Sequence, residues 1–212
     1  MSLQINKDTK IYGSFSSNPG NNGTFFFNHA FQKHNINAIY KSFYSDNLKN
    51  TITSVKSLGF CGFAISMPFK IEILEYLDDI EETALEIGSV NTVIISNKKL
   101  KGYNTDYYGV KEYFKQHNFN KINILGNGGL SKSIQKVCFD NNISYIIHDR
   151  NDIEKIDYVY NEIFINATPA DIISKNNKII DFRPFTQDGS ELFRYQAIKQ
   201  FKLYTGIEYE YS

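Results

Sequence analysis

The sequence contains little cysteine and no cluster of metal-binding residues. Two cysteines occur among 212 residues, Cys61 and Cys138, and both lie in apolar stretches. We therefore expect two buried, reduced thiols and no disulfide. The four histidines show no pairing at metal-ligand spacing, so the sequence predicts no metal site.

The sequence also lacks an excess of charge of either sign and any long apolar run. Its 23 basic and 23 acidic residues balance, and without a basic tract there is no electrostatic reason to expect a nucleic-acid partner. No stretch approaches the roughly 20 apolar residues that span a bilayer. Residues 1–7 lack the apolar run of a signal peptide. We expect a cytoplasmic protein with no membrane partner that binds a small molecule.

The first half of the sequence alternates between strand-like and helix-like apolar patterns. A hairpin is expected around Asn97-Lys98, which have the chemistry of a two-residue turn. The order of the elements favours a partly parallel α/β sheet. The expected strands are residues 11–13, 38–43, 62–66, 90–96 and 99–103, and the expected helices are residues 25–33, 48–57, 71–76 and 81–86.

The second half predicts a smaller, Rossmann-like sheet. Helices are expected at residues 106–116, 131–141 and 190–204, and strands at residues 121–125, 144–148, 162–167 and 178–182. The fold class is therefore α/β with two domains. We expect a substrate-binding domain of residues 1–104, joined by a C-terminal helix of residues 190–212, and a shortened NAD(P)-binding domain of residues 105–189.

A glycine loop, Gly126-Asn127-Gly128-Gly129, follows the expected strand of residues 121–125. Such a turn lets the backbone approach a pyrophosphate and directs a helix N-terminus at it, although the glycines can also be purely structural. Asp149 follows the next strand, where an acidic residue accepts hydrogen bonds from a ribose 2′-hydroxyl and favours NAD. Adjacent Arg150 can pair with the 2′-phosphate of NADP, so the two cues conflict. The alternative is a solvated surface pair.

Lys70 and Asp106 are candidates for proton transfer. Taken singly, Lys70 would be a solvent-exposed lysine and Asp106 a helix N-cap. Taken together, they can converge at the carboxyl edge of a sheet and share a substrate hydroxyl there, facing a cleft between domains. The carboxylate would then orient the ammonium group that transfers the proton. Asn91 and Asn104 offer neutral amides to further hydroxyl groups, which suits a polyol.

Five motifs in order give the sequence a resemblance to shikimate dehydrogenases and their quinate-using relatives, over nearly the whole chain. The motifs are Gly62-Phe63-Ala64-Ile65-Ser66-Met67-Pro68-Phe69-Lys70, Gly88-Ser89-Val90-Asn91-Thr92-Val93, Gly102-Tyr103-Asn104-Thr105-Asp106, Asn166-Ala167-Thr168-Pro169, and Tyr195-Gln196-Ala197 with Phe201 and Thr205-Gly206. The resemblance implies an oxidoreductase of aromatic amino acid biosynthesis, in the chorismate pathway, that interconverts 3-dehydroshikimate and shikimate.

The resemblance also implies the roles of individual residues. Lys70 and Asp106 would be catalytic. The substrate would be oriented by Ser66, Asn91, Thr24, Asn21 and Gln196. NADP, with NAD as a possible substitute, would be held by Gly126, Asn127, Gly128, Gly129, Asp149, Arg150 and Thr168.

The sequence departs from the family pattern at several positions. The Ser-x-Ser stretch that holds the substrate carboxylate is replaced by Asn21 and Thr24, a pattern more similar to the divergent shikimate dehydrogenase-like branch. The cofactor signature Asn-Arg-Thr becomes Asp149-Arg150-Asn151, and the second domain is short. The alternative function is therefore a catalytically weak or inactive binding or regulatory protein. A monomer or homodimer is expected.

Overall fold

The computed structural model describes residues 5–149 and 152–209. The chain divides into two compact units, one of residues 1–105 with 197–212 and one of residues 106–196. The C-terminal helix α6 (Gln187–Thr205) contributes residues to both units, because the division falls between Gln196 and Ala197. Among the described residues, no helix is long and apolar enough to cross a membrane.

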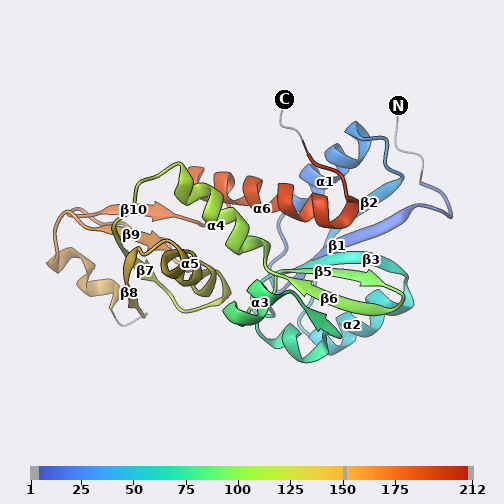
Figure 1. The fold of residues 1–212 in the computed structure, drawn as a ribbon, viewed down its shortest axis with the longest axis horizontal. Helices are drawn as coiled ribbons and strands as arrows, with labels where there is room; N and C mark the ends of the chain where they lie inside the picture. Colours follow the sequence, from blue (N-terminus) through green and yellow to red (C-terminus); the bar gives the residue numbers. More distant parts are fainter. Residues whose placement is uncertain (1–4, 150–151, 210–212) are drawn as a thin grey trace. The chain divides into compact units, whose positions relative to one another are not determined.

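The first unit contains a six-stranded sheet of order β2-β1-β3-β5-β6-β4 (Figure 1). Strands β1, β2 and β3 are parallel, whereas β5 pairs antiparallel with β3 and β6. This arrangement confirms the predicted partly parallel α/β sheet. The strands are β1 (Lys10–Ser16), β2 (Ala38–Tyr44), β3 (Phe60–Ile65), β4 (Asp79–Ile80), β5 (Thr92–Ser96) and β6 (Lys99–Tyr103). The helices are α1 (Asn22–Lys33), α2 (Leu48–Ser57), the 3₁₀ helix η1 (Glu72–Tyr76) and α3 (Glu82–Ile87).

Aromatic side chains cover both faces of this sheet. The Tyr12 ring of β1 packs in tilted contacts against Phe31 of α1 and Tyr204 of α6, so these two helices lie on one face. Phe15, three residues further along β1, packs into the core formed with α2 and η1 on the other face. Alternating side chains along a strand point to opposite faces, which is why one strand serves both layers.

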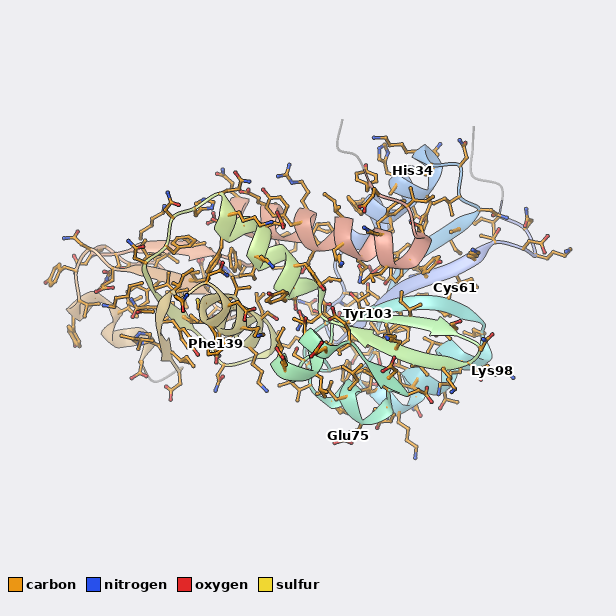
Figure 2. All side chains as sticks on the ribbon, in the orientation of Figure 1. His34, Cys61, Glu75, Lys98, Tyr103 and Phe139 are labelled. Carbon is orange, nitrogen blue, oxygen red and sulfur yellow. The ribbon has the colours of Figure 1, made fainter. Side chains whose placement is uncertain are left out.

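Strands β5 and β6 form a hairpin, and the motifs of Asn91 and Asn104 lie at its open end. Asn97 and Lys98 have φ values of 50° and 64°, as a two-residue turn of this kind requires. The predicted turn is therefore confirmed. Figure 2 shows Lys98 at the tip of the hairpin and Tyr103 at its other end, where the chain leaves the sheet.

The second unit contains a four-stranded, fully parallel sheet of order β10-β9-β7-β8 (Figure 1). The chain passes from β7 through α5 to β8 on one side and then returns to β9 on the other, as in a Rossmann-like fold. The elements are α4 (Thr105–Lys115), β7 (Lys121–Leu125), α5 (Gly129–Asp140), β8 (Ser144–His148), the 3₁₀ helix η2 (Ile153–Tyr158), β9 (Ile163–Asn166) and β10 (Lys178–Asp181).

Helices α4 and α6 pack tightly within the second unit. The Tyr113 hydroxyl donates to Asp188 Oδ1 at 2.6 Å. Burial together with this carboxylate raises the pKa of Tyr113. A Cβ on Gly109 would lie 3.1 Å from Gln196 Cβ, so glycine permits the close approach of the two helices.

The two cysteines are free, as expected. Cys138 is fully buried on α5, and burial raises the pKa of its thiol to about 12. Cys61 of β3 is only partly buried, so the prediction of two buried thiols is wrong for this residue.

Candidate functional site

The Lys70 segment is a tight turn that follows β3. The N–H of Phe69 donates to the carbonyl of Ser66 at 3.0 Å, and the Phe69 ring is buried in the core of the first unit. The carbonyl of Lys70 accepts a hydrogen bond from the N–H of Val90 at 2.8 Å. The backbone of Lys70 is therefore fixed beside the Asn91 motif, while its side chain is half-buried and Ser66 is exposed.

Asn91 and Asn104 are buried where β5 begins and β6 ends. The N–H of Asn91 donates to the carbonyl of Tyr103, and its own carbonyl accepts from the N–H of Ile65. Asn104 Nδ2 donates to the carbonyl of Ser89 at 2.8 Å. Asn91 thus joins the end of β3 to the end of β6. The structure brings the motifs containing Lys70, Asn91 and Asn104 together in the first unit.

Asp106 lies in the first turn of α4 and is only 2% exposed. It directly follows Thr105, whose N–H donates to Asn91 Oδ1 at 2.8 Å. Because α4 begins at Thr105, Asp106 lies inside the helix and not at its N-cap. A carboxylate in the first turn is stabilised by the helix dipole.

Thr24 belongs to a chain of hydroxyl groups in the first unit. Ser14 Oγ donates to Ser42 Oγ at 3.0 Å, and Ser42 Oγ lies 3.1 Å from Thr24 Oγ1, which also accepts from the Ser42 N–H. Either of the Ser42 and Thr24 hydroxyls can be the donor in their contact. When Ser42 donates, the Thr24 proton is left for an acceptor outside this chain of hydroxyls.

Asn21 immediately precedes α1 and is exposed. Its carbonyl accepts from the N–H of Phe25 at 2.9 Å, but its side chain makes no capping hydrogen bond. Asn28, one turn after Thr24, donates to the carbonyls of Thr24 and Tyr40. Thr24 is therefore held firmly against β2.

The glycine loop lies at the carboxyl edge of the parallel sheet, between β7 and α5. Gly126 has φ +102°, and a Cβ there would lie 2.8 Å from Thr168 Cγ2. At Gly128, by contrast, no atom of the described residues lies within 4 Å of the place that a Cβ would take, and Asn127 and Gly128 are exposed. The loop therefore has room for a ligand at Gly128.

Thr168 follows β9, the strand next to β7. Its hydroxyl donates to Asn166 Oδ1 at 2.7 Å and accepts from the Ala170 N–H at 3.1 Å. The hydroxyl is thus used within the loop, and Thr168 faces Gly126 with its methyl group. Because sheet order reverses at β7, the loops after β7 and β9 meet at the edge where open parallel sheets commonly bind ligands in a crevice.

Asp149 lies at the same edge of the second unit. The carbonyl of His148, at the end of β8, accepts from the N–H of Gly126 at 2.9 Å, and Asp149 is the next residue and is exposed. The structure therefore brings the glycine loop, Thr168 and Asp149 together. Arg150, the other predicted cofactor residue, lies outside the described residues.

Gln196 is a partly buried residue with an enclosed side-chain oxygen. Its Oε1 is buried and, within the described part of the chain, has no hydrogen-bond partner. A buried acceptor without a partner is costly, so it indicates a place where a ligand donor or a water binds. The helix contact at Gly109 fixes the position of this side chain.

Several polar residues around these motifs were not identified from the sequence. Thr92 and Thr105 are buried neighbours of the predicted asparagines, and their place inside the two motifs is the signal that could have found them. Gln200 and Ser42 join the site through contacts across more than 15 residues of sequence, for which no local pattern exists. Among the residues that the structure describes, no three of His, Cys, Asp and Glu gather as metal ligands.

The chain is similar to known proteins along most of its length. A family model described as the shikimate dehydrogenase substrate binding domain matches residues 23–93. A shikimate dehydrogenase-like protein of Haemophilus influenzae is 39% identical over 133 residues, covering 61% of this chain and 49% of the relative. The solved structure of a shikimate 5-dehydrogenase-like protein aligns with a TM-score of 0.78 and 28% identity, covering 98% of this chain and 95% of the other.

The chain spans about half the length of several curated relatives that it matches. A shikimate dehydrogenase (NADP(+)) of Pyrococcus furiosus is instead aligned almost completely, at 32% identity over 253 residues, covering 96% of this chain and 93% of the relative. The alignment is longer than the chain, so this relative has segments that the chain lacks. On this match, the chain belongs to the shikimate dehydrogenase family.

Proposed function

We propose that the protein is an NAD(P)-dependent oxidoreductase that interconverts 3-dehydroshikimate, or a similar ring keto acid, and shikimate. The observation that carries the proposal is the joining of the Lys70 and Asn91 motifs, through the hydrogen bond from the Val90 N–H to the Lys70 carbonyl. Family membership and the relative named as an NADP(+) enzyme support it.

The second unit is proposed to bind the cofactor. The open space at Gly128 fits a pyrophosphate, which the glycine loop would contact with Gly126, Asn127, Gly128 and Gly129. Thr168 would border the same crevice, while Asp149 and Arg150 would contact the adenosine ribose. The cofactor, when bound, supplies the acceptor or donor of a hydride. NADP is proposed first because of the relative's name, with NAD as the substitute that Asp149 favours.

We propose that Lys70, of the first unit, and Asp106, the first residue of the second unit, move the proton of the reacting hydroxyl of a ring substrate. The amide of Asn91 and the hydroxyl of Ser66 would bind the other ring hydroxyls. Thr24 and Asn21 would bind the carboxylate. Gln196, whose Oε1 is buried without a partner among the described residues, would accept from a substrate hydroxyl. We propose a cytoplasmic monomer or homodimer.

Replacing Lys70 tests this proposal. Lys70→Ala and Asp106→Ala should each lower kcat by about two to four orders of magnitude, because a positioned acid–base group is lost. The assay follows absorbance of the reduced cofactor with shikimate or quinate and with NADP or NAD. Lys56→Ala is the control, since Lys56 is exposed on α2. Near-normal turnover of Lys70→Ala would contradict the assigned role.

A non-catalytic binding protein is the second candidate. The observation that favours it is the set of segments present in the Pyrococcus furiosus relative and lacking here. A titration with NADP and NAD, followed by one with shikimate, separates the two functions. Binding of the ring carboxylate without any nucleotide binding would support the second candidate over the first.

A further inference from the structure

A buried chain of hydrogen bonds in the first unit leads from α6 to the amide of Asn91. Gln200 Nε2 donates to Thr92 Oγ1 at 2.7 Å, and Thr92 Oγ1 lies 3.0 Å from Asn91 Oδ1. Each of the three residues is at most 6% exposed. In such surroundings an unpaired polar group is costly, so each member depends on its neighbour.

Thr105 completes the set of donors around the Asn91 oxygen. Its N–H lies 2.8 Å from Asn91 Oδ1 and its hydroxyl 3.0 Å from the same atom. Because the Thr105 N–H can only donate, the Asn91 amide must turn its oxygen toward this set. That orientation also sets the direction of the Asn91 Nδ2–H groups, which would bind a substrate hydroxyl.

Gln200 decides which way the Thr92 hydroxyl donates. The Nε2 atom of Gln200 can only donate, so it occupies an acceptor position on Thr92 Oγ1. The Thr92 proton is then directed to Asn91 Oδ1 or to Thr105 Oγ1, which is 3.1 Å away. Either choice reinforces the same orientation of the Asn91 amide.

We propose that Gln200 is a positioning residue for the ring substrate: through Thr92 it fixes the amide of Asn91 in its binding orientation. The inference rests on the proposed function, because it assigns the Asn91 amide to a substrate hydroxyl. Gln200 is not proposed to touch substrate or cofactor. It acts by holding the Asn91 amide in the orientation that binds the substrate hydroxyl.

Three variants test the inference. Gln200→Met keeps the size of the side chain and removes the donor. Gln200→Glu keeps the shape of the side chain but replaces the donor by a carboxylate, which accepts hydrogen bonds. The Thr92 hydroxyl would then turn to this carboxylate and away from Asn91. Val55→Ala is the matched control, because it removes buried volume from the core of the same unit without touching the hydrogen-bonded chain.

The kinetic result separates positioning from stability. Gln200→Met should raise the KM for shikimate about five- to tenfold, as for one lost hydrogen bond, with kcat and the KM for NADP within about twofold of wild type. Gln200→Glu should raise the shikimate KM further. An unchanged KM in Gln200→Met, or an equal rise in Val55→Ala, would overturn the inference.

A second readout does not need turnover. The side-chain amide signal of Asn91 in a ¹⁵N NMR spectrum, identified by its loss in Asn91→Asp, should shift in Gln200→Met and stay in place in Val55→Ala. A signal that does not move in Gln200→Met overturns the inference. If the wild type turns over no substrate, the proposed function fails, and the amide signal still decides whether Gln200 orients Asn91.

Discussion

Thr24 accepts the Ser42 N–H and lies within hydrogen-bond distance of the Ser42 hydroxyl, and when Ser42 is the donor between the two hydroxyls the Thr24 proton is available to a ligand. A hydrogen bond from this hydroxyl to a carboxylate would be charge-assisted and therefore among the stronger kinds. Ser42 lies behind Thr24, because its hydroxyl accepts a hydrogen bond from the Ser14 hydroxyl and lies within hydrogen-bond distance of Thr24. The proposed recognition of the carboxylate therefore involves three hydroxyls that are far apart in sequence.

Replacing Thr24 by valine should weaken binding of the carboxylate. The expected rise in the KM for shikimate is about 10- to 100-fold, as for a hydrogen bond to a charged group. Ser42→Ala should give a smaller rise, since it only frees the Thr24 hydroxyl to rotate. The measurement is initial-rate kinetics with shikimate and with its methyl ester.

Thr53→Val serves as the control, because Thr53 bonds to the carbonyl of Lys49 on the exposed side of α2. Thr24→Val should weaken binding of the methyl ester far less than binding of shikimate, since the ester carries no charge. Equal losses for both ligands would exclude a carboxylate-binding role for Thr24.

Single residues could be proposed from the sequence where they lie inside a motif. Lys70, Asn91 and Asp106 each have distinctive neighbours in the chain, and the structure joins the first two through Val90. Gln200 has no distinctive neighbours that mark its role, because its partner Thr92 is 108 residues away in sequence. Contacts that exist only after folding leave no local pattern in the sequence.

At the scale of elements, the turn from β7 to α5 carries two glycines with different physical requirements. Gly126 has a left-handed φ, and a Cβ there would collide with Thr168 Cγ2. Gly128 has φ −88°, which any residue adopts, and a Cβ there would enter open space. The backbone therefore needs the first glycine, and the proposed cofactor needs the second.

Alanine substitutions should separate these two requirements. Gly126→Ala should lower the free energy of unfolding by about 1–3 kcal/mol, because it adds backbone strain and a steric clash. Gly128→Ala should leave the melting temperature unchanged and weaken NADP binding at least tenfold by filling the pyrophosphate position. Thermal melts and nucleotide titrations measure the two effects. If Gly128→Ala lost stability but kept its affinity for NADP, the proposed contact between Gly128 and the pyrophosphate would be contradicted.

Elements were predictable where apolar periodicity and turn chemistry agree. The helix of α2 and the strands β7 and β8 fall on the predicted residues, and the turn at Asn97-Lys98 has the left-handed backbone that its type requires. Two-residue β4 was not predicted, since so short a strand has no period and forms only by pairing with β6. The beginning of α5 was placed two residues late, because Gly129 is a poor helix former that here starts the helix.

At the scale of the whole molecule, each of the two units contains one cysteine, whose reactivity reports on that unit. Cys61 belongs to the first unit and is partly buried, whereas Cys138 is fully buried in the second. Since only the thiolate reacts and burial raises the pKa of Cys138 to about 12, labelling of this thiol in the native protein requires the second unit to open. The two thiols therefore report on different parts of the chain.

Labelling of Cys138 should slow when NADP is added. A ligand at about 100 times its Kd stabilises the form that binds it by about 2.7 kcal/mol, which reduces opening, and hence labelling, about 100-fold. The measurement is a mass-spectrometric time course with a thiol reagent in Cys61→Ser, and Cys138→Ala is the control for specificity. Shikimate, whose proposed binding residues lie mainly in the first unit, should slow the labelling of Cys138 much less. If NADP leaves the rate unchanged while it binds by titration, the cofactor does not stabilise the second unit, and the glycine loop is not where it binds.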